Sequence, residues 1–185
     1  MKYYELINFF INKFDYKSYL ELGLRDASNT FNNVNCILKH SVDINKDCNP
    51  TYNMSTNDFF EYNICKYDII FIDADHEKNQ VLKDFDNAFA CLSPNGTIIM
   101  DDINPLDEYL LDPKFCNNAW EAWAELRTRE NLTMHAIDNT YFGYVRVGQQ
   151  VPLNLKVYPT YEWFNANRKR ICLPIPEETL YVVYQ

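Results

Sequence analysis

The chain has 185 residues, of which 47% are hydrophobic and 23% charged, as expected for an ordinary globular domain with a substantial core. Its net charge of -9 argues against binding to nucleic acid, and no apolar run approaches the roughly 20 residues that a membrane-spanning helix needs. The six cysteines lack metal-ligand spacing and are interpreted as reduced thiols, so we expect a cytoplasmic protein.

The first third of the chain alternates helical and strand patterns. Apolar residues recur on one helical face over residues 2–14, which predicts an amphipathic helix. The polar loop 23–30 is expected to open a helix with Ser28 or Asn29 as its cap. Three strands are expected, at residues 18–22, 37–44 and 50–55.

The middle of the chain contains its clearest strand signal. Residues 69–72 are apolar, too few for a helix and without polar alternation, which predicts a strand at 67–72 that is buried on both faces, as in a parallel sheet. A helix over 81–92, a turn at 93–96 and a second buried strand at 97–100 are expected to follow. The later predicted elements are a helix near 115–127 and strands at 132–137 and 141–147.

This alternation predicts a doubly wound, Rossmann-like α/β fold, in which helices cover both faces of a mostly parallel sheet of about seven strands. We expect the domain to comprise residues 1–149, including the N-terminal helix. Residues 150–185, rich in proline and aromatic side chains, are expected to form a C-terminal extension that packs on the same domain.

Polar residues gather where the two buried strands end. The first strand is followed by Asp73-Ala-Asp-His76 and the second by Asp101 and Asp102. Asp73 and Asp101 are 28 residues apart, the length of a strand–helix–strand crossover, so both should lie at the sheet edge where ligands bind. Clustered carboxylates predict a divalent cation such as Mg²⁺, Mn²⁺ or Ca²⁺, with His76 as a proton acceptor.

A simpler interpretation is available for each of these residues alone. Asp75 and Asp102 could cap helices, and His76 could be an exposed loop residue, since aspartate often occupies helix N-termini. Their joint placement at the ends of two neighbouring strands favours a functional site.

Several segments resemble the class I S-adenosylmethionine-dependent methyltransferases. Leu20-Glu-Leu-Gly23 and the loop behind it are similar to the first motif of that family. Residues 67–76 and 92–102 resemble the fourth and fifth strands of its metal-dependent O-methyltransferase branch. The resemblance covers residues 17–147 and does not include the C-terminal extension.

The resemblance implies a role for each matching residue. Glu21 would hold the amino group of S-adenosylmethionine and Asp43 its ribose, and His76 would act as the catalytic base. The other implied cofactor-binding residues are Gly23, Asn29, Asn57 and Asp73. The implied ligands of the divalent metal are Asp73, Asp101 and Asp102.

We therefore expect an S-adenosylmethionine-dependent O-methyltransferase that uses a divalent metal and methylates a hydroxyl of a small molecule, a sugar being one candidate. No nucleic-acid or membrane partner is expected, and the sequence leaves the oligomeric state open. One alternative is a metal-dependent glycosyltransferase that uses Asp73-Ala-Asp75 as a DxD motif. Another is a catalytically silent cofactor-binding or scaffold protein, suggested by Ala27, where the family's first motif usually has a second glycine.

Overall fold

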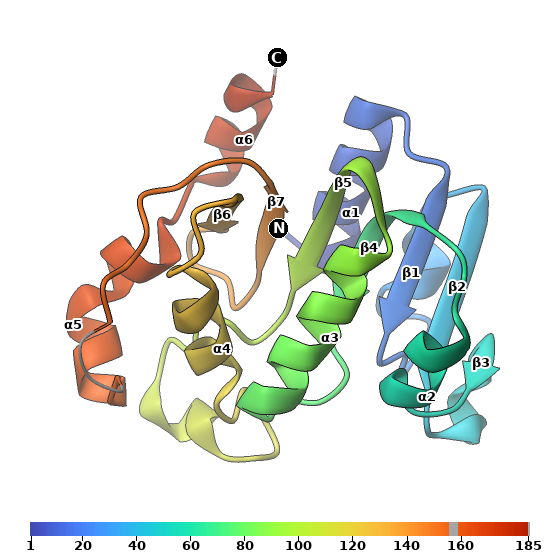
Figure 1. Cartoon of the computed structure of the whole chain (residues 1–185), viewed down its shortest axis with the longest axis horizontal. Helices are drawn as coiled ribbons and strands as arrows, with labels where there is room; N and C mark the ends of the chain where they lie inside the picture. The colour runs from blue at the N-terminus through green and yellow to red at the C-terminus, as the bar shows by residue number, and fades with distance from the viewer. Residues whose placement is uncertain (156–158, 185) are drawn as a thin grey trace. The chain divides into compact units, whose positions relative to one another are not determined.

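The structure, a computed structural model, describes residues 1–155 and 159–184 of the chain. Its strands are β1 (Ser18–Leu22), β2 (Leu38–Asp43), β3 (Tyr52–Asn53), β4 (Tyr67–Ile72), β5 (Leu92–Met100), β6 (Leu132–Ala136) and β7 (Gly143–Val147). They take the order β3-β2-β1-β4-β5-β7-β6 in the sheet (Figure 1). Strand β1 pairs in parallel with β2 and β4, and β2 with β3, whereas β6 and β7 are antiparallel. The predicted Rossmann-like, mostly parallel α/β fold is confirmed.

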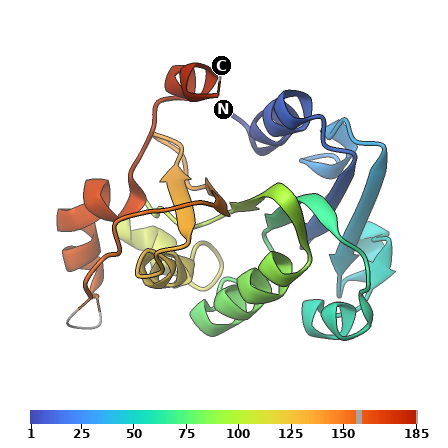
Figure 2. The same cartoon turned by 45° about the horizontal axis from the view of Figure 1, so that its top comes forward.

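The α-helices among the described residues are α1 (Tyr3–Phe14), α2 (Thr56–Tyr62), α3 (Lys78–Ala90), α4 (Ala119–Leu126), α5 (Tyr161–Cys172) and α6 (Glu177–Val183). Helix α1 buries its apolar face and lies against β4, where the Tyr3 and Phe71 ring centroids are 5.4 Å apart (Figures 1 and 2). Within residues 1–155 and 159–184, none of the helices is both long and apolar enough to cross a lipid bilayer.

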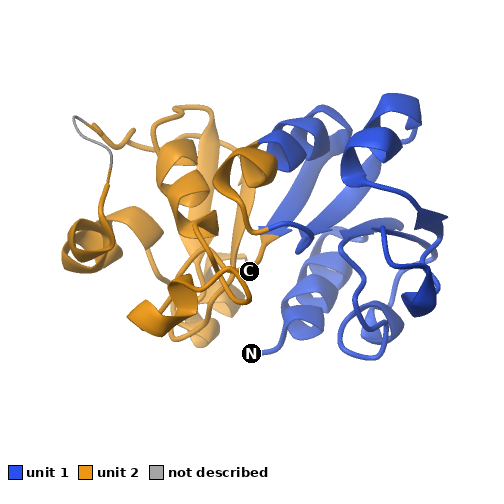
Figure 3. Ribbon diagram, turned by 90° about the horizontal axis from the view of Figure 1, so that it is seen from below, with its two compact units in different colours: residues 1–75, 83–99 blue, residues 76–82, 100–185 orange. Residues whose placement is uncertain are grey.

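The chain divides into two compact units (Figure 3). Unit 1 comprises residues 1–75 and 83–99, and unit 2 comprises residues 76–82 and 100–185. The expected boundary between residues 149 and 150 stays a prediction. Residues 156–158 and 185 of the expected C-terminal extension lie outside the described residues.

The core of unit 1 is built on β1 and β4. Residues 19–22 and 69–72 are at most 3% exposed, so both faces of these strands are covered. Burial on both faces is what a continuous apolar run predicts for a central parallel strand. The residues that follow the carboxyl ends of these two strands form part of the candidate site.

Aromatic side chains of α4 and α5 form part of the core of unit 2. Trp120 and Trp123 of α4 are buried, as their helical spacing predicts. The Trp120 ring centroid lies 4.8 Å from that of Phe164 in α5, and Trp123 Nε1 donates to the Ile171 carbonyl at 3.3 Å. Helices α4 and α5 therefore pack side by side, as Figures 1 and 2 also show.

Two local predictions are wrong. No α-helix opens at Ser28 or Asn29; the chain instead forms turns and the 3-10 helix η1 (Phe31–Asn33). Asp26 Oδ1 accepts bonds from the Ser28 backbone N–H and hydroxyl at 2.9 and 2.8 Å, and such local bonds compete with helix formation. The predicted turn at 93–96 lies within β5, where Asn95 takes the left-handed conformation (φ 65°) that asparagine tolerates.

Candidate functional site

Three adjacent parallel strands of unit 1 end at the same level. Leu22, the last residue of β1, pairs in register with Val42 of β2 and Ile72 of β4. The residues one step further along each chain segment are therefore neighbours across the sheet. We call these three residues the carboxyl-end row: Gly23, Asp43 and Asp73.

The carboxyl-end row lies at the point where the strand order reverses. From β1, the chain adds β2 and β3 on one side and β4 on the other. In open α/β sheets, ligands bind outside the carboxyl ends of the strands at this switch point. The row therefore occupies the position in the fold that most favours a ligand.

Gly23 allows the backbones after β1 and β4 to approach closely. Its φ is 85°, a left-handed conformation that side chains with a Cβ rarely adopt. A Cβ at this position would lie 2.0 Å from the Asp73 carbonyl oxygen and 2.6 Å from the Ala74 Cα. The glycine is therefore required by both conformation and space.

Asp43 ties together the loops that follow β1 and β2. Its Oδ2 accepts from the Arg25 backbone N–H at 2.9 Å, and its Oδ1 accepts from the Asn45 N–H at 2.7 Å. Because each carboxylate oxygen can accept two hydrogen bonds, both oxygens keep capacity for a ligand donor. The Asp43 side chain is thus held in place and can still accept hydrogen bonds from a ligand.

Glu21 is a buried acid beside the carboxyl-end row. It is 2% exposed and accepts a hydrogen bond from the Tyr19 hydroxyl. The pKa of Glu21 is raised to about 8: burial is the largest cause, the Tyr19 hydrogen bond opposes it, the nearby Asp73 charge adds to the rise, and Lys39 opposes it. Glu21 is therefore mostly protonated at neutral pH, and an added positive charge beside it would favour its ionised form.

Asn29 and Asn57 lie on loops and helices that leave the same edge of unit 1. Asn29 is exposed in a turn, where its N–H donates to the Asp26 carbonyl at 3.0 Å. Asn57 is the second residue of α2, which follows β3 and is capped by the Ser55 hydroxyl. Both were predicted as cofactor-binding residues, and these roles stay predictions.

Asn53 was missed by the sequence analysis. It pairs in register with Asp43, and its Nδ2 donates to the Asp43 and Ile44 carbonyls at 2.9 and 3.0 Å. It therefore extends the carboxyl-end row onto β3. The strand expected at residues 50–55 contains β3, but the bonds of Asn53 go to backbone carbonyls, which every residue possesses, so the sequence carries no signal for its role.

In unit 2, His76 is held between a backbone carbonyl and a carboxylate. Its Nδ1 hydrogen-bonds the Phe115 carbonyl oxygen, and its Nε2 lies 3.2 Å from Asp102 Oδ2. Because a carbonyl only accepts, Nδ1 must carry the proton. The neutral imidazole then has its lone pair on Nε2, where it can accept a proton or bind a cation.

Cys116 completes what we call the His76 cluster, which also contains Asp101 and Asp102. The buried Cys116 Sγ donates to Asp102 Oδ1 at 3.0 Å. Burial raises the pKa of Cys116, and the bond to Asp102 and the charges of Asp102 and Asp101 raise it further, so it remains a thiol donor. Asp102 itself has a left-handed backbone (φ 59°), a conformation often found at functional sites.

Asp73 and His76 are linked through the chain. Three peptide steps separate them, so their Cα atoms lie within about 11 Å of each other. Asp75, between them, is exposed. The predicted metal ligands Asp73, Asp101 and Asp102 and the predicted base His76 keep these roles as predictions.

Comparison with known proteins identifies the fold. Residues 32–103 match the family model described as a methyltransferase domain. The matched segment runs from η1 through β2 and β4 to the residues just after β5, and so includes Asp43, Asp73, His76, Asp101 and Asp102. No curated protein matches the sequence.

Solved methyltransferase structures share the fold at low sequence identity. The O-methyltransferase TomG from Streptomyces achromogenes is 13% identical, with a TM-score of 0.56 over 77% of this chain and 78% of its own. An O-methyltransferase from Bacillus cereus is also 13% identical, with a TM-score of 0.57 over 78% and 80%. The methyltransferase MycE of mycinamycin biosynthesis is 12% identical, with a TM-score of 0.53 over 84% of this chain and 51% of its own. The predicted class I methyltransferase fold is confirmed.

Proposed function

We propose that this protein is an S-adenosylmethionine-dependent O-methyltransferase that acts on a small hydroxylated molecule, for which a sugar is one candidate. The observation that carries the proposal is the carboxyl-end row at the switch point between β1 and β4. It sets carboxylates beside a glycine that keeps the backbone close. S-adenosylmethionine carries an ammonium group and ribose hydroxyls, which donate to carboxylates.

The similar solved structures support the cofactor. TomG was solved with S-adenosylmethionine, and the Bacillus cereus protein was solved with S-adenosylhomocysteine. MycE was solved with magnesium, S-adenosylhomocysteine and mycinamycin VI. For this chain we propose the same methyl donor, and a divalent metal as a second cofactor.

The acids of unit 1 are proposed to bind different parts of the methyl donor. Asp43 is placed to accept from the ribose hydroxyls because both of its oxygens keep spare lone pairs. Glu21 is proposed to pair with the amino group, directly or through water, and to lose its proton as it does so. Asn57 is proposed to border the adenine. Asn29, in the loop after β1, is proposed to contact the cofactor as well. When bound, S-adenosylmethionine supplies an electrophilic methyl group.

His76 is proposed to remove the proton of the substrate hydroxyl. The Phe115 carbonyl fixes the tautomer that has its lone pair on Nε2, and this nitrogen is the acceptor. Asp102 Oδ2, 3.2 Å from Nε2, then stabilises the imidazolium that forms. The arrangement gives His76 an orienting group on one nitrogen and a stabilising charge beside the other.

Asp73, Asp101 and Asp102 are proposed to hold the divalent metal. Their carboxylate oxygens are the hard ligands that Mg²⁺, Mn²⁺ and Ca²⁺ prefer. Asp102 Oδ1 accepts a hydrogen bond from Cys116, and Asp102 Oδ2 faces His76. These contacts fix the orientation of the carboxylate without a bound ion. When bound, the ion would lower the pKa of the substrate hydroxyl. The His76 lone pair could serve as a ligand instead of a base, and the two roles exclude each other.

Calorimetric titration with S-adenosylmethionine, alone and with Mg²⁺ or Mn²⁺, tests the cofactor assignment. We expect a dissociation constant on the order of micromolar. No binding in any of the three conditions contradicts the proposal. Formation of S-adenosylhomocysteine with a panel of hydroxylated small molecules then tests the reaction.

A His76→Gln variant separates the two roles of the histidine. If His76 is the base, turnover falls by about 10² to 10⁴ while Mn²⁺ affinity is unchanged, and this is the expected result. A loss of Mn²⁺ affinity would make it a ligand. His40→Gln is the matched control, since His40 Nδ1 bonds the Tyr67 hydroxyl at 2.8 Å in unit 1.

The same measurements distinguish the alternatives. Stabilisation by a nucleotide-sugar where S-adenosylmethionine has no effect would favour the glycosyltransferase, although the comparisons found methyltransferases. Binding of S-adenosylmethionine without turnover, unchanged by His76→Ala, would favour a silent cofactor-binding protein.

A further inference from the structure

Unit 2 contains a cavity of about 380 Å³, which we call the Arg127 cavity. It lies between the end of α4, strand β6, the segment after β7 and the end of α5. Its volume is within the range of small-molecule sites. The lining residues are Arg127, Thr133, Met134, His135, residues 149–153, Arg170 and Leu173. None of them belongs to the His76 cluster or to the carboxyl-end row.

Arg127 is the most unusual residue of this cavity. It is the C-cap of α4 and only 4% exposed. Its buried Nε and Nη1 atoms have no hydrogen-bond partner among residues 1–155 and 159–184. Burial lowers the pKa of the Arg127 guanidinium, which nonetheless stays charged near neutral pH. A buried charge whose N–H groups lack partners destabilises the folded protein, so an anion that accepts from them would be bound strongly.

The other lining residues offer no protein carboxylate to this charge. The chain has 26 acidic and 17 basic residues, and yet the described residues that line the cavity include two arginines and neither aspartate nor glutamate. His135 does not add a second positive charge: burial lowers its pKa, and the Arg127 charge adds to this effect against the bond to the Leu173 carbonyl. The lining is therefore cationic in a protein whose net charge is negative.

Gln150 and the apolar residues define the rest of the cavity. Gln150 Nε2 donates to the Arg129 and Leu126 carbonyls at 2.8 and 3.2 Å, which fixes the amide beside Arg127. Leu153 N–H donates to the Arg127 carbonyl at 2.8 Å, so the segment after β7 is fastened to the end of α4. Apolar lining is supplied by Met134, Val151, Pro152, Leu153 and Leu173.

We propose that the Arg127 cavity binds a small organic anion. Its carboxylate or phosphate would accept from the Arg127 guanidinium, with the exposed Arg170 adding a second positive charge, and its apolar body would contact the apolar lining. Arginine pairs well with both oxyanions because its N–H groups match them in a planar, two-bond geometry. This site is separate from the proposed methyl-transfer site.

Calorimetry on the intact chain without S-adenosylmethionine tests the proposal. The probes are phenylacetate, phenyl phosphate and, as a neutral analogue, benzyl alcohol, each to about 10 mM at constant ionic strength. We expect at least one anion to bind and benzyl alcohol not to bind, and the tighter of the two anions identifies the preferred oxyanion. Binding of neither anion, or equal binding of benzyl alcohol, overturns the proposal.

Three variants assign the binding to the cavity. Arg127→Met keeps the volume and removes the charge, and should weaken anion binding by about tenfold or more. Arg170→Gln changes an exposed residue, so it should fold normally and weaken binding by about threefold. Lys169→Gln, the adjacent exposed residue outside the lining, should leave the affinity unchanged. Anion binding that is the same in all four proteins overturns the proposal.

Discussion

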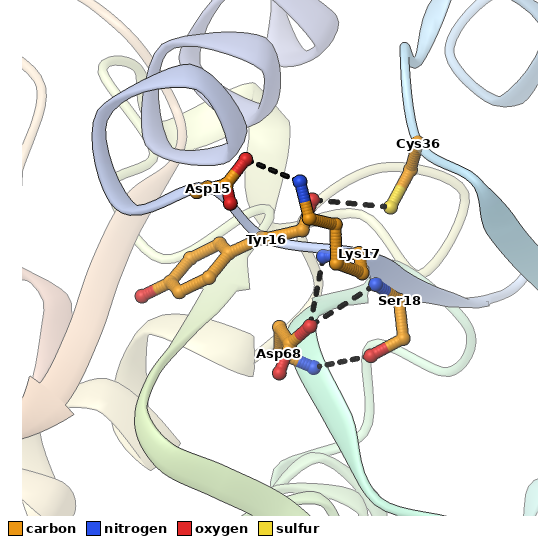
Figure 4. A network of polar contacts seen from close by, with 6 residues as sticks. All are labelled: Asp15, Tyr16, Lys17, Ser18, Cys36 and Asp68. Carbon is orange, nitrogen blue, oxygen red and sulfur yellow. Dashed lines mark hydrogen bonds and ion pairs between the residues drawn. The ribbon is translucent and has the colours of Figure 1, made fainter.

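Asp43 and Asp68 stand at opposite ends of the parallel strands of unit 1, and each accepts two backbone N–H groups. Asp68, near the start of β4, accepts both with the same oxygen: its Oδ2 bonds the N–H groups of Lys17 and Ser18 at 2.9 and 3.1 Å (Figure 4). Its own N–H donates to Ser18 Oγ at 3.0 Å, which closes the arrangement. Asp43 uses both oxygens and binds two different loops.

The difference shows how one residue type can serve structure at one end and a ligand at the other. Around Asp68, the chain supplies donors at short range: burial alone would raise its pKa, but the Lys17 and Ser18 amides and side-chain bonds lower it overall. At the amino end, the polar groups are satisfied by one another. At the carboxyl end, Asp43 ties two loops together and keeps the capacity to accept further hydrogen bonds.

Substitution of the two glycines of unit 1 by alanine should give the largest difference between the two ends of the strands. Gly23→Ala forces a Cβ against the Asp73 carbonyl in a left-handed conformation. We expect S-adenosylmethionine affinity to fall by about a hundredfold, because a displacement of about 1 Å at a site has effects of this size. Calorimetric titration measures the loss.

Gly96→Ala is the matched change at the amino end. Its Cβ would lie 2.8 Å from the Asp68 carbonyl oxygen and 2.7 Å from Leu92 Cγ, without a left-handed backbone. It should lower the free energy of unfolding, and the folded fraction should bind S-adenosylmethionine as the unchanged protein does. Equal losses of affinity in both variants would show that the two ends are not functionally distinct.

The sequence predicted the strands of unit 1 well because their signal is local. The apolar run Ile69 to Ile72 marks β4 as a buried strand, Tyr19, Leu20 and Leu22 indicate β1, and the residues that follow parallel strands lie at one edge of the sheet. Asp43 and Asp73 could therefore be assigned to this edge from the sequence alone. The helix expected at Ser28 failed because hydrogen bonds from Asp26 depend on one local conformation, which composition does not specify.

The contacts of the His76 cluster could not be predicted in the same way. His76 and Phe115 are 39 residues apart, and the acceptor is a backbone carbonyl that every residue possesses. Cys116 gave no signal because a single cysteine without a metal-ligand pattern is uninformative. Arg127 gave no signal either, because only the packing of the described residues shows that its buried Nε and Nη1 atoms have no hydrogen-bond partner among them.

A Glu21→Gln variant should change how the stability of unit 1 depends on pH. The pKa of Glu21 is raised from 4.5 to about 8, so between these values the folded state binds a proton that the unfolded state has lost. The free energy of unfolding therefore falls as pH rises through this window, by a total on the order of a few kcal/mol. Glutamine cannot titrate, and the variant should lack this decline.

Urea unfolding at about pH 5 and about pH 8.5 measures the effect as the difference between the two proteins. Parallel pH profiles would contradict the raised pKa of Glu21.

The same variant also reports on function. If the cofactor's amino group ionises Glu21, binding at neutral pH releases a proton in the unchanged protein and none in Glu21→Gln, which calorimetry in buffers of different ionisation enthalpy detects.

Substitution of Asp43 and Asp68 by asparagine should give the smallest changes in stability and cofactor affinity. It also compares the two ends of the strands most directly. In Asp68→Asn, the side-chain carbonyl oxygen can keep both amide bonds, because a single oxygen accepts them in the native protein. In Asp43→Asn, the side-chain NH₂ group must turn toward either the Arg25 or the Asn45 amide, since both Asp43 oxygens are used. We expect Asp68→Asn to cost about 1 kcal/mol of stability and to leave cofactor affinity unchanged.

Asp43→Asn should cost about 1 to 3 kcal/mol and weaken S-adenosylmethionine binding by about tenfold, because it loses both a fixed loop and a charged acceptor for the ribose. Urea unfolding and calorimetric titration on both variants give the two quantities independently. Asp43→Asn with native affinity would remove Asp43 from the cofactor site and leave it a loop-fastening role like that of Asp68. Loss of affinity in Asp43→Asn alone would assign the carboxyl end to the ligand, because the two substitutions are chemically identical and differ only in where the strands place them.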